Sequence, residues 1–415
     1  MLVNPGETRR LARTVRIDDP GPLDRYLGSA GDCAFLSQGQ GLIGLGTLAR
    51  FDTDSLDAAD IWWQEFCASL EHETELPDLP GVGPIAFGTF LFDPDSSADQ
   101  STLIVPQVVI GRRANVSWMT TIGIGSLPKA ELPHPSAAAP SPGMVSWADG
   151  AMPGPVWETM VGEAVEYIRR GVVEKVVLAR DMLVRANEPI EPGFLVRRLR
   201  AEYPQTWTYL VDGMVGATPE LLVERRRGLI TSRVLAGTVR RADANAGVGQ
   251  LSAQLIASDK DRREHAYAAQ SVAETLRPYV TAMNVPPAPY VLELPNVLHL
   301  ATDVTAVADE QISSLALAQA IHPTAAVCGT PREAARQLIA ELESMDRGRY
   351  AGPVGWIDMT GDGQWAVALR GGQLSRVDPH EIQVFAGCGI VADSVPEDEL
   401  LESVAKFIPM RDALS

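Results

Sequence analysis

The sequence has few cysteines, no long apolar run and no excess of basic residues. Its 415 residues include four cysteines, none in a C-x-x-C pair, so neither a zinc site nor a disulfide framework is predicted. No apolar stretch approaches the roughly 18 residues that a membrane-spanning helix needs, so no membrane association is expected. Residues 1–19 lack the apolar core of a signal peptide, and a cytoplasmic location is therefore expected.

Acidic residues clearly outnumber basic ones. The chain has 53 Asp and Glu against 35 Lys and Arg, which gives a net charge of −18. A protein with this charge is not expected to bind nucleic acid or an anionic membrane surface. If its substrate is an anion, a local basic pocket or a metal ion must offset the charge. The hydrophobic content of 46% is ordinary for a globular enzyme with a large core.

Composition divides the chain into three regions. Residues 1–126 contain short apolar strands around one helix and carry no catalytic constellation. Residues 127–155 are rich in Pro, Ala and Ser, which is typical of a linker, and residues 156–415 alternate strands with amphipathic helices. Apolar periodicity predicts helices over 57–70, 156–170, 192–201, 259–279, 313–321 and 331–342.

The C-terminal run VFAGCGIVADSVPEDELLESVAKF combines several polar groups. Residues 386–389 predict a glycine turn, in which Gly387 and Gly389 would expose backbone N–H groups. A helix follows, and its positions i, i+3 and i+7 share one face. These positions are occupied by Glu399, Glu402 and Lys406. The face could bind a metal ion and an anionic ligand, or it could be a solvated acidic face.

Lys175 and Glu220 are candidates for proton transfer. Alternation turns Lys175 to the same side of its strand as the apolar Val177, and a lysine that is neutral there can act as a general base. Glu220 begins an apolar strand, and a carboxyl group beside apolar surface stays protonated to higher pH, as a general acid requires. Taken alone, each also fits an ordinary role, as an edge-strand lysine in water or as a cap.

A second pair of carboxylates lies on the helix predicted over 259–279. Asp261 and Glu264 are separated by about one turn, like Glu399 and Glu402. Oxygen ligands without a cysteine cluster or a spaced histidine pair favour Mg²⁺ over zinc. An exposed pair among arginines is the alternative.

Five further residues could bind a ligand. Gly237 and Thr238 are predicted to end a strand, where a backbone N–H and a hydroxyl could meet a carboxylate. His299 lies between leucines and is more often a core histidine than a catalytic one. Arg370 and Tyr350 could hold a ligand carboxylate, although a surface arginine and a core tyrosine are the simpler interpretations.

Nine segments, taken in order, strongly resemble the chorismate-utilising enzymes, and they span about residues 155–412. They are EKVVLAR, ATPELLVE, LAGTVRR, KDRREH, VLHLATDV, HPTAAVCGTPREAA, RGRYAGPVGWID, WAVALR and AGCGIVADSVPEDELLESVAKF. The family includes isochorismate, salicylate, anthranilate and aminodeoxychorismate synthases.

Two positions distinguish members of this family. Lys175 implies water as the nucleophile, because members that use ammonia typically have glutamine there. Ala326 implies isochorismate synthesis, because salicylate synthases look to have threonine at this position and isochorismate synthases alanine. The expected reaction is therefore conversion of chorismate to isochorismate. Salicylate synthase and a non-catalytic chorismate-binding relative are the alternatives.

The resemblance also implies a fold and residue roles. The expected fold is α/β (α+β), with two stacked antiparallel-rich sheets flanked by helices and the active site in the cleft between them. Lys175 is the expected base and Glu220 the expected acid. Mg²⁺ is expected on Glu264 and Glu402, supported by Glu399 and Asp261. The expected substrate-binding residues are Gly237, Thr238, His299, Ala326, Tyr350, Arg370, Gly387, Gly389 and Lys406. A monomer without a glutaminase subunit is expected.

Overall fold

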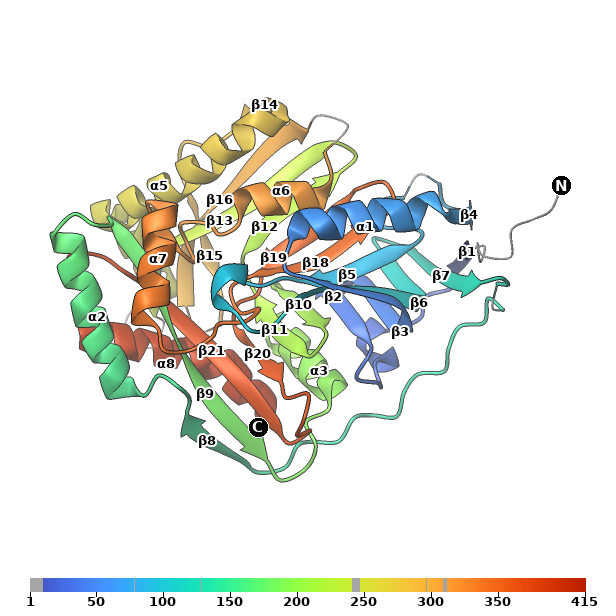
Figure 1. Ribbon diagram of the computed structural model, residues 1–415, viewed down its shortest axis with the longest axis horizontal. Coiled ribbons are helices and arrows are strands. Elements are labelled where there is room, and N and C mark those ends of the chain that lie inside the picture. The colour runs from blue at the N-terminus through green and yellow to red at the C-terminus, as the bar shows by residue number, and fades with distance from the viewer. Residues whose placement is uncertain (1–9, 78, 128, 241–246, 296, 309–311) are drawn as a thin grey trace.

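The computed structural model describes residues 10–415, except 78, 128, 241–246, 296 and 309–311 (Figure 1). The described part of the chain contains eight α-helices. They are α1 (Leu56–Ala68), α2 (Gly154–Arg169), α3 (Pro192–Glu202), α4 (Val248–Ala257), α5 (Asp259–Leu276), α6 (Ser314–Ile321), α7 (Arg332–Leu342) and α8 (Pro396–Leu414). The helices predicted from the sequence are all present, with bounds that differ by a few residues, and α4 is additional. None of the described helices is both long and apolar enough to cross a membrane.

The strands form one hydrogen-bonded network in which two arms separate at β6 (Ser101–Arg113). The first arm continues from β6 in the order β3 (Gln40–Thr53), β2 (Cys33–Ser37), β10 (Trp207–Val211), β11 (Met214–Thr218), β20 (Gly371–Leu374), β21 (Glu381–Ile390) and β9 (Lys175–Ala186). Two short strands pair with β9, namely β8 (Val145–Asp149) and β17 (Gly329–Thr330).

The second arm leaves β6 through a different neighbour. Its order is β5 (Ile85–Thr89), β18 (Pro353–Asp358), β19 (Gly363–Val367), β12 (Leu221–Arg226), β13 (Leu229–Arg240) and β16 (Val297–Ala308). Two short strands, β14 (Val280–Asn284) and β15 (Tyr290–Glu293), pair with β16. Farther along the edge of β6 that pairs with β5 lies β7 (Val116–Ile124), followed by β1 (Arg10–Ile17) and β4 (Leu70–Thr74). Among the described pairs only β1–β4 is parallel.

This architecture confirms the predicted fold class, with the refinement that the two sheets share β6. The N-terminal region pairs directly with the C-terminal one, because β2 is hydrogen-bonded to β10 and β5 to β18. The region predicted as a linker, 127–155, contains β8, which adds to the edge of β9.

Helices cover the outer faces of both arms (Figure 1). The helices α5 and α6 pack on the second arm, whereas α2, α3, α7 and α8 gather around the first. The apolar residues Leu195 of α3 and Phe407 of α8 share one buried cluster with Leu210 of β10, which explains why these helices lie on this arm. Serine side chains begin several helices, as Ser258 does by accepting a hydrogen bond from the Asp261 N–H.

Two local predictions from glycine are wrong. Residues 386–389 do not turn, because β21 continues through them in register with β9. A Cβ on Gly387 would lie 2.9 Å from the Leu178 oxygen, so this glycine serves close packing of the two strands. Likewise β13 does not end at Gly237, which instead forms a bulge with φ of +76°.

Candidate active site

A cavity of about 230 Å³ lies between the two arms. Its walls come from β9 and β21 of the first arm, β13 and β16 of the second, and helices α5 and α8. Every candidate residue named from the sequence lines it. These residues are Lys175, Glu220, Gly237, Thr238, Asp261, Glu264, His299, Ala326, Tyr350, Arg370, Gly387, Gly389, Glu399, Glu402 and Lys406.

Glu220 and Arg370 lie where the chain crosses between the arms. Pro219 and Glu220 connect β11 of the first arm to β12 of the second. Residues 368–370, which include Arg370, connect β19 of the second arm back to β20 of the first. The Val367 N–H donates to the Glu220 carbonyl at 3.1 Å, and the Ala217 N–H donates to the Arg370 carbonyl at 3.3 Å. These backbone bonds fix the main chain of Glu220 and Arg370 where the chain crosses between the arms.

Glu220 is a buried carboxyl group among cations. Its residue is 6% exposed, and burial raises the pKa of Glu220 to about 7, although Lys175, Arg370 and Lys406 act in the opposite direction. A substantial fraction of this carboxyl group is therefore protonated near neutral pH, which a general acid needs.

Lys175 is the first residue of β9, and its side chain points inward as predicted. Its side chain is 13% exposed and its Nζ atom lies 2.7 Å from Oε1 of Glu264 on α5. Gly389 on the neighbouring strand leaves room for it, since a Cβ there would lie 2.8 Å from Lys175 Cε. The lysine therefore reaches across the cavity from the first arm to α5.

Carboxylates from α5 and α8 face the same cavity. Ligand atoms of Glu399 and Glu402 on α8 and of Cys388 on β21 all lie within 4.8 Å of one another. Ser394 donates to Glu399 Oε1 at 2.8 Å and so orients that carboxylate. Asp261 and Glu264 line the same cavity from α5, but among the described residues they belong to no ligand group this close. Carboxylate oxygens are the type of ligand that Mg²⁺ prefers.

Lys406 links α8 to β21. Its Nζ atom lies 2.6 Å from Glu402 Oε1 and donates to the Gly387 carbonyl at 2.7 Å. Burial alone would raise the pKa of Glu402, but Lys406 and Arg370 outweigh it and lower that pKa. The Glu402 side chain is therefore a negatively charged carboxylate, which is the form that binds a cation.

Arg370 and His299 lie next to each other in the cavity wall. Arg370 is half-buried, and its buried Nη1 atom has no hydrogen-bond partner among the described residues. Its Nη2 atom lies 3.5 Å from His299 Nε2, and His299 Nδ1 lies 2.9 Å from Thr238 Oγ1. Burial, with Arg370, lowers the pKa of His299 to about 3, so the ring is neutral. A guanidinium only donates, so Nε2 accepts and Nδ1 donates to Thr238.

Comparison with known proteins identifies the family. A sequence model for the family described as "Chorismate binding enzyme" matches residues 30–415. The chain belongs to the chorismate-binding enzymes.

Similar enzymes are known from several bacteria. The chain is 36% identical over 266 residues to the isochorismate synthase DhbC of Bacillus subtilis, covering 61% of this chain and 66% of that protein. It is 32% identical over 384 residues to the isochorismate synthase EntC of Escherichia coli, covering 91% and 93%. The structure of MenF, the menaquinone-specific isochorismate synthase from Escherichia coli, has a TM-score of 0.80 at 24% identity, covering 98% and 95%. That last likeness concerns the fold alone.

In this chorismate-binding enzyme the cavity also contains residues that sequence reasoning missed. Phe385 stacks on Tyr350 at a centroid distance of 5.0 Å, and Ser394 orients Glu399. Arg347 lines the wall beside Ala326. The motif RGRYAGP signalled this arginine, because two arginines, Arg347 and Arg349, lie within three residues before the buried Tyr350.

Proposed function

We propose that this protein is an isochorismate synthase, which converts chorismate to isochorismate. The relatives that match it at 32% and 36% identity carry this name. The observation that carries the proposal is a single cavity that joins an inward lysine, a buried carboxyl group with raised pKa and an arginine whose buried Nη1 atom has no partner among the described residues. Lys175 favours water as the nucleophile, and Ala326 favours isochorismate as the product.

The reaction moves a hydroxyl group from C4 to C2 of the ring. Lys175, in its neutral form, takes a proton from the water molecule that attacks C2. Glu220, in its protonated form, gives a proton to the departing C4 hydroxyl, which leaves as water. One water enters and one leaves, so the net change is an isomerisation that needs no redox cofactor. Support comes from the origin of the two groups, since Lys175 belongs to the first arm and Glu220 to the crossing into the second.

Four carboxylates on two helices would hold Mg²⁺. We assign Glu264 and Glu402 as direct ligands, with Glu399 and Asp261 in support, because all four line the cavity and Glu402 is anionic. Bound there, Mg²⁺ would supply positive charge for the ring carboxylate. Asp261 has a shorter side chain than glutamate, and a bridging water would complete its reach.

The carboxylates of the substrate need cationic and N–H groups. Arg370 and Tyr350 are assigned to the enolpyruvyl carboxylate, supported by the unpartnered Arg370 Nη1. The Gly387 carbonyl points to Lys406, and the N–H of a strand residue lies on the same edge as its carbonyl, so this N–H is also available to the ligand. Gly237 and Thr238 are assigned to the ring-carboxylate side, with neutral His299 against the ring.

The test is incubation of the purified protein with chorismate and Mg²⁺, followed by chromatography. Isochorismate in equilibrium with chorismate, without pyruvate, is the expected result. Salicylate with pyruvate would replace the proposal by salicylate synthase. No turnover with Mg²⁺ present would identify a binding protein and refute the catalytic assignment.

A further inference from the structure

A buried ion pair lies behind the cavity wall. Glu343 ends helix α7 and Arg347 follows one turn later in sequence, with Nε–Oε2 and Nη2–Oε1 distances of 2.8 and 2.5 Å. Their side chains are 2% and 4% exposed. Burying such a pair costs desolvation energy that two apolar side chains would not cost. Its presence therefore calls for hydrogen bonds that only the charged side chains can make.

The side chains of Glu343 and Arg347 form hydrogen bonds with the backbone of β9 beyond the end of its partner strand β17. The short strand β17 pairs only with Lys175 and Val176. Beyond that point the Val177 carbonyl accepts from Arg347 Nη2 at 2.7 Å, and the Ala179 N–H donates to Glu343 Oε1 at 2.7 Å. The two side chains thus satisfy the Val177 carbonyl and the Ala179 N–H, whereas the Val177 N–H donates to the Cys328 carbonyl at 2.7 Å.

The same guanidinium also holds the opposite wall. Arg347 Nη1 donates to the Val327 carbonyl at 3.2 Å, next to Ala326, and its Cζ atom lies 4.3 Å from the centroid of the Phe92 ring. All three nitrogens of Arg347 are therefore bonded to protein. This separates Arg347 from Arg370, whose Nη1 has no partner among the described residues.

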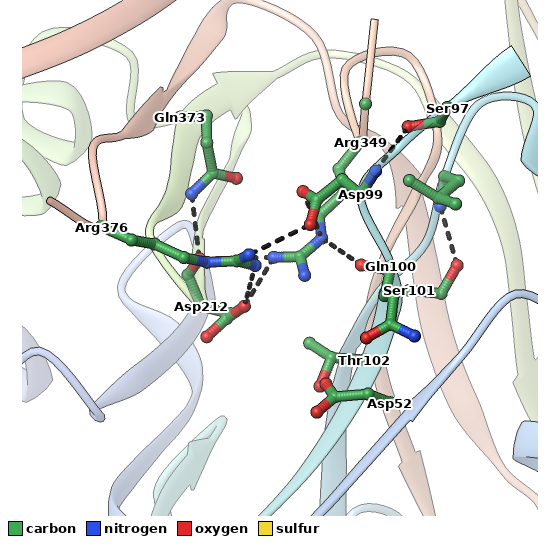
Figure 2. Close-up of polar contacts among 12 residues, drawn as sticks. Asp52, Ser97, Asp99, Gln100, Ser101, Thr102, Asp212, Arg349, Gln373 and Arg376 are labelled. Carbon is green, nitrogen blue, oxygen red and sulfur yellow. Dashed lines mark hydrogen bonds and ion pairs between the residues drawn. The ribbon is translucent and has the colours of Figure 1, made fainter. Parts of the chain in front are cut away.

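The other arginine of the RGRYAGP motif points away from this wall. Arg349 bonds to Asp212 at 2.7 Å and to the Gln100 carbonyl at 2.8 Å, where Arg376 also converges (Figure 2). The segment that leads into Tyr350 is thus fixed from two sides, and of its two arginines Arg347 is the one that bonds to the strand of Lys175.

We propose that Glu343 and Arg347 are positioning residues that hold the Lys175 strand at a fixed separation from the Ala326 wall. This inference rests on the proposed function. With the separation fixed, water reaches C2 from Lys175 and the product cannot turn in the cavity. With the wall released, isochorismate can turn so that its C2 hydrogen meets the enolpyruvyl methylene group. Transfer of that hydrogen breaks the ether C–O bond and gives salicylate and pyruvate, with no other reactant.

The test compares Glu343→Gln and Arg347→Lys with the wild type and with Glu166→Gln, which alters an exposed pair on α2. The glutamine keeps an acceptor for the Ala179 N–H but loses the charge. Thermal unfolding selects folded variants, and kcat, KM and the ratio of pyruvate to isochorismate are then measured. We expect kcat to fall about tenfold or more in both variants, with little change in KM and a raised pyruvate ratio. Glu166→Gln should match the wild type.

Two outcomes would overturn the inference. Folded variants with unchanged kcat and product ratio would show that the pair is structural only. A large rise in KM alone would show that Arg347 binds the substrate directly. If the wild type itself formed no isochorismate, the proposed function would fail instead, and the two failures are therefore distinguishable. If Arg347→Lys did not fold, Glu343→Gln would decide.

Discussion

The Nζ atom of Lys175 lies 2.7 Å from Oε1 of Glu264, so the proposed base is ion-paired with a proposed metal ligand. The pair bridges the first arm and helix α5. Any group that engages Glu264 therefore also changes the partner of Lys175. Proton transfer and cation binding are coupled through this one contact.

Replacing Lys175 by alanine should abolish water addition while leaving substrate binding in place. We expect kcat to fall by about 10²-fold or more, because a positioned base contributes at least that much. The exposed Lys129→Ala is the matched control. Product chromatography gives the rate and calorimetry gives chorismate affinity. Normal turnover by the variant would refute the base assignment.

The raised pKa of Glu220 predicts that kcat falls on the alkaline side of its pH profile. The pKa of Glu220 is about 7, so the proton-donating form is lost as the pH rises through that value, and kcat should decline there. Glu220→Gln should lower kcat by about 10²-fold or more and remove this decline. Because burial raises the folded-state pKa of Glu220, the charged carboxylate destabilises the folded protein at alkaline pH. The glutamine variant should therefore unfold at a higher temperature at pH 8. A variant less stable than the wild type would contradict the burial argument.

Removal of the divalent cation should stop the reaction. Chelation should abolish turnover and added Mg²⁺ should restore it, while Glu402→Gln should lose the Mg²⁺ response together with activity. The exposed Glu397 on the same helix supplies the control Glu397→Gln. An unchanged Mg²⁺ titration in Glu402→Gln would refute the assignment of Glu402 as a metal ligand. Calorimetric Mg²⁺ binding gives a readout that does not depend on turnover.

Cys388 should make the protein sensitive to thiophilic metals. Its sulfur shares a 4.8 Å cluster with Glu399 and Glu402, and sulfur prefers Cd²⁺ or Zn²⁺ to Mg²⁺. Added Cd²⁺ should produce a thiolate charge-transfer absorption in the ultraviolet and compete with Mg²⁺. Cys388→Ala should lose this absorption, and the partly buried Cys67→Ala should keep it. Equal signals in the two variants would place the cadmium elsewhere.

Asp212 should stabilise the fold outside the active site. It accepts from Arg50, Arg349 and Arg376. Burial alone would raise the pKa of Asp212, but Arg50 and Arg349 outweigh it and hold that pKa well below its ordinary value. The stabilisation is therefore complete above about pH 4 and is lost as the pH falls further. Asp212→Asn should lower the free energy of unfolding by about 3 kcal/mol at neutral pH, and by less in acid. Denaturant unfolding at both pH values provides the check.

The sequence predicted which residues line the cavity, but it did not predict the backbone conformation at all of them. Asp261, Glu264, Glu399 and Glu402 could be paired because helical spacing is regular and the resemblance covers both helices. Gly387 was assigned to a turn because glycine relaxes φ, whereas its actual role is to let β21 approach β9. That role depends on a partner strand about 200 residues away in sequence, which no local pattern contains.

Long-range bonds explain the remaining misses. Arg347 reaches Val177 and Val327, and its role is set by where β17 ends. The pairing of β6 with both β3 and β5 could not be predicted from local patterns either, because the two partner strands meet only in the folded sheet. Periodicity identifies a strand and its faces, but it does not name the strand beside it.

The fork at β6 has a consequence for protein engineering. Cutting the chain near residue 150 would strip β2 from β10 and β5 from β18, which uncovers a strand edge on each arm of the remaining fragment. Bare edges of this kind recruit other chains. A shortened catalytic fragment should therefore precipitate on expression, and the two halves should yield soluble protein only when they are produced together.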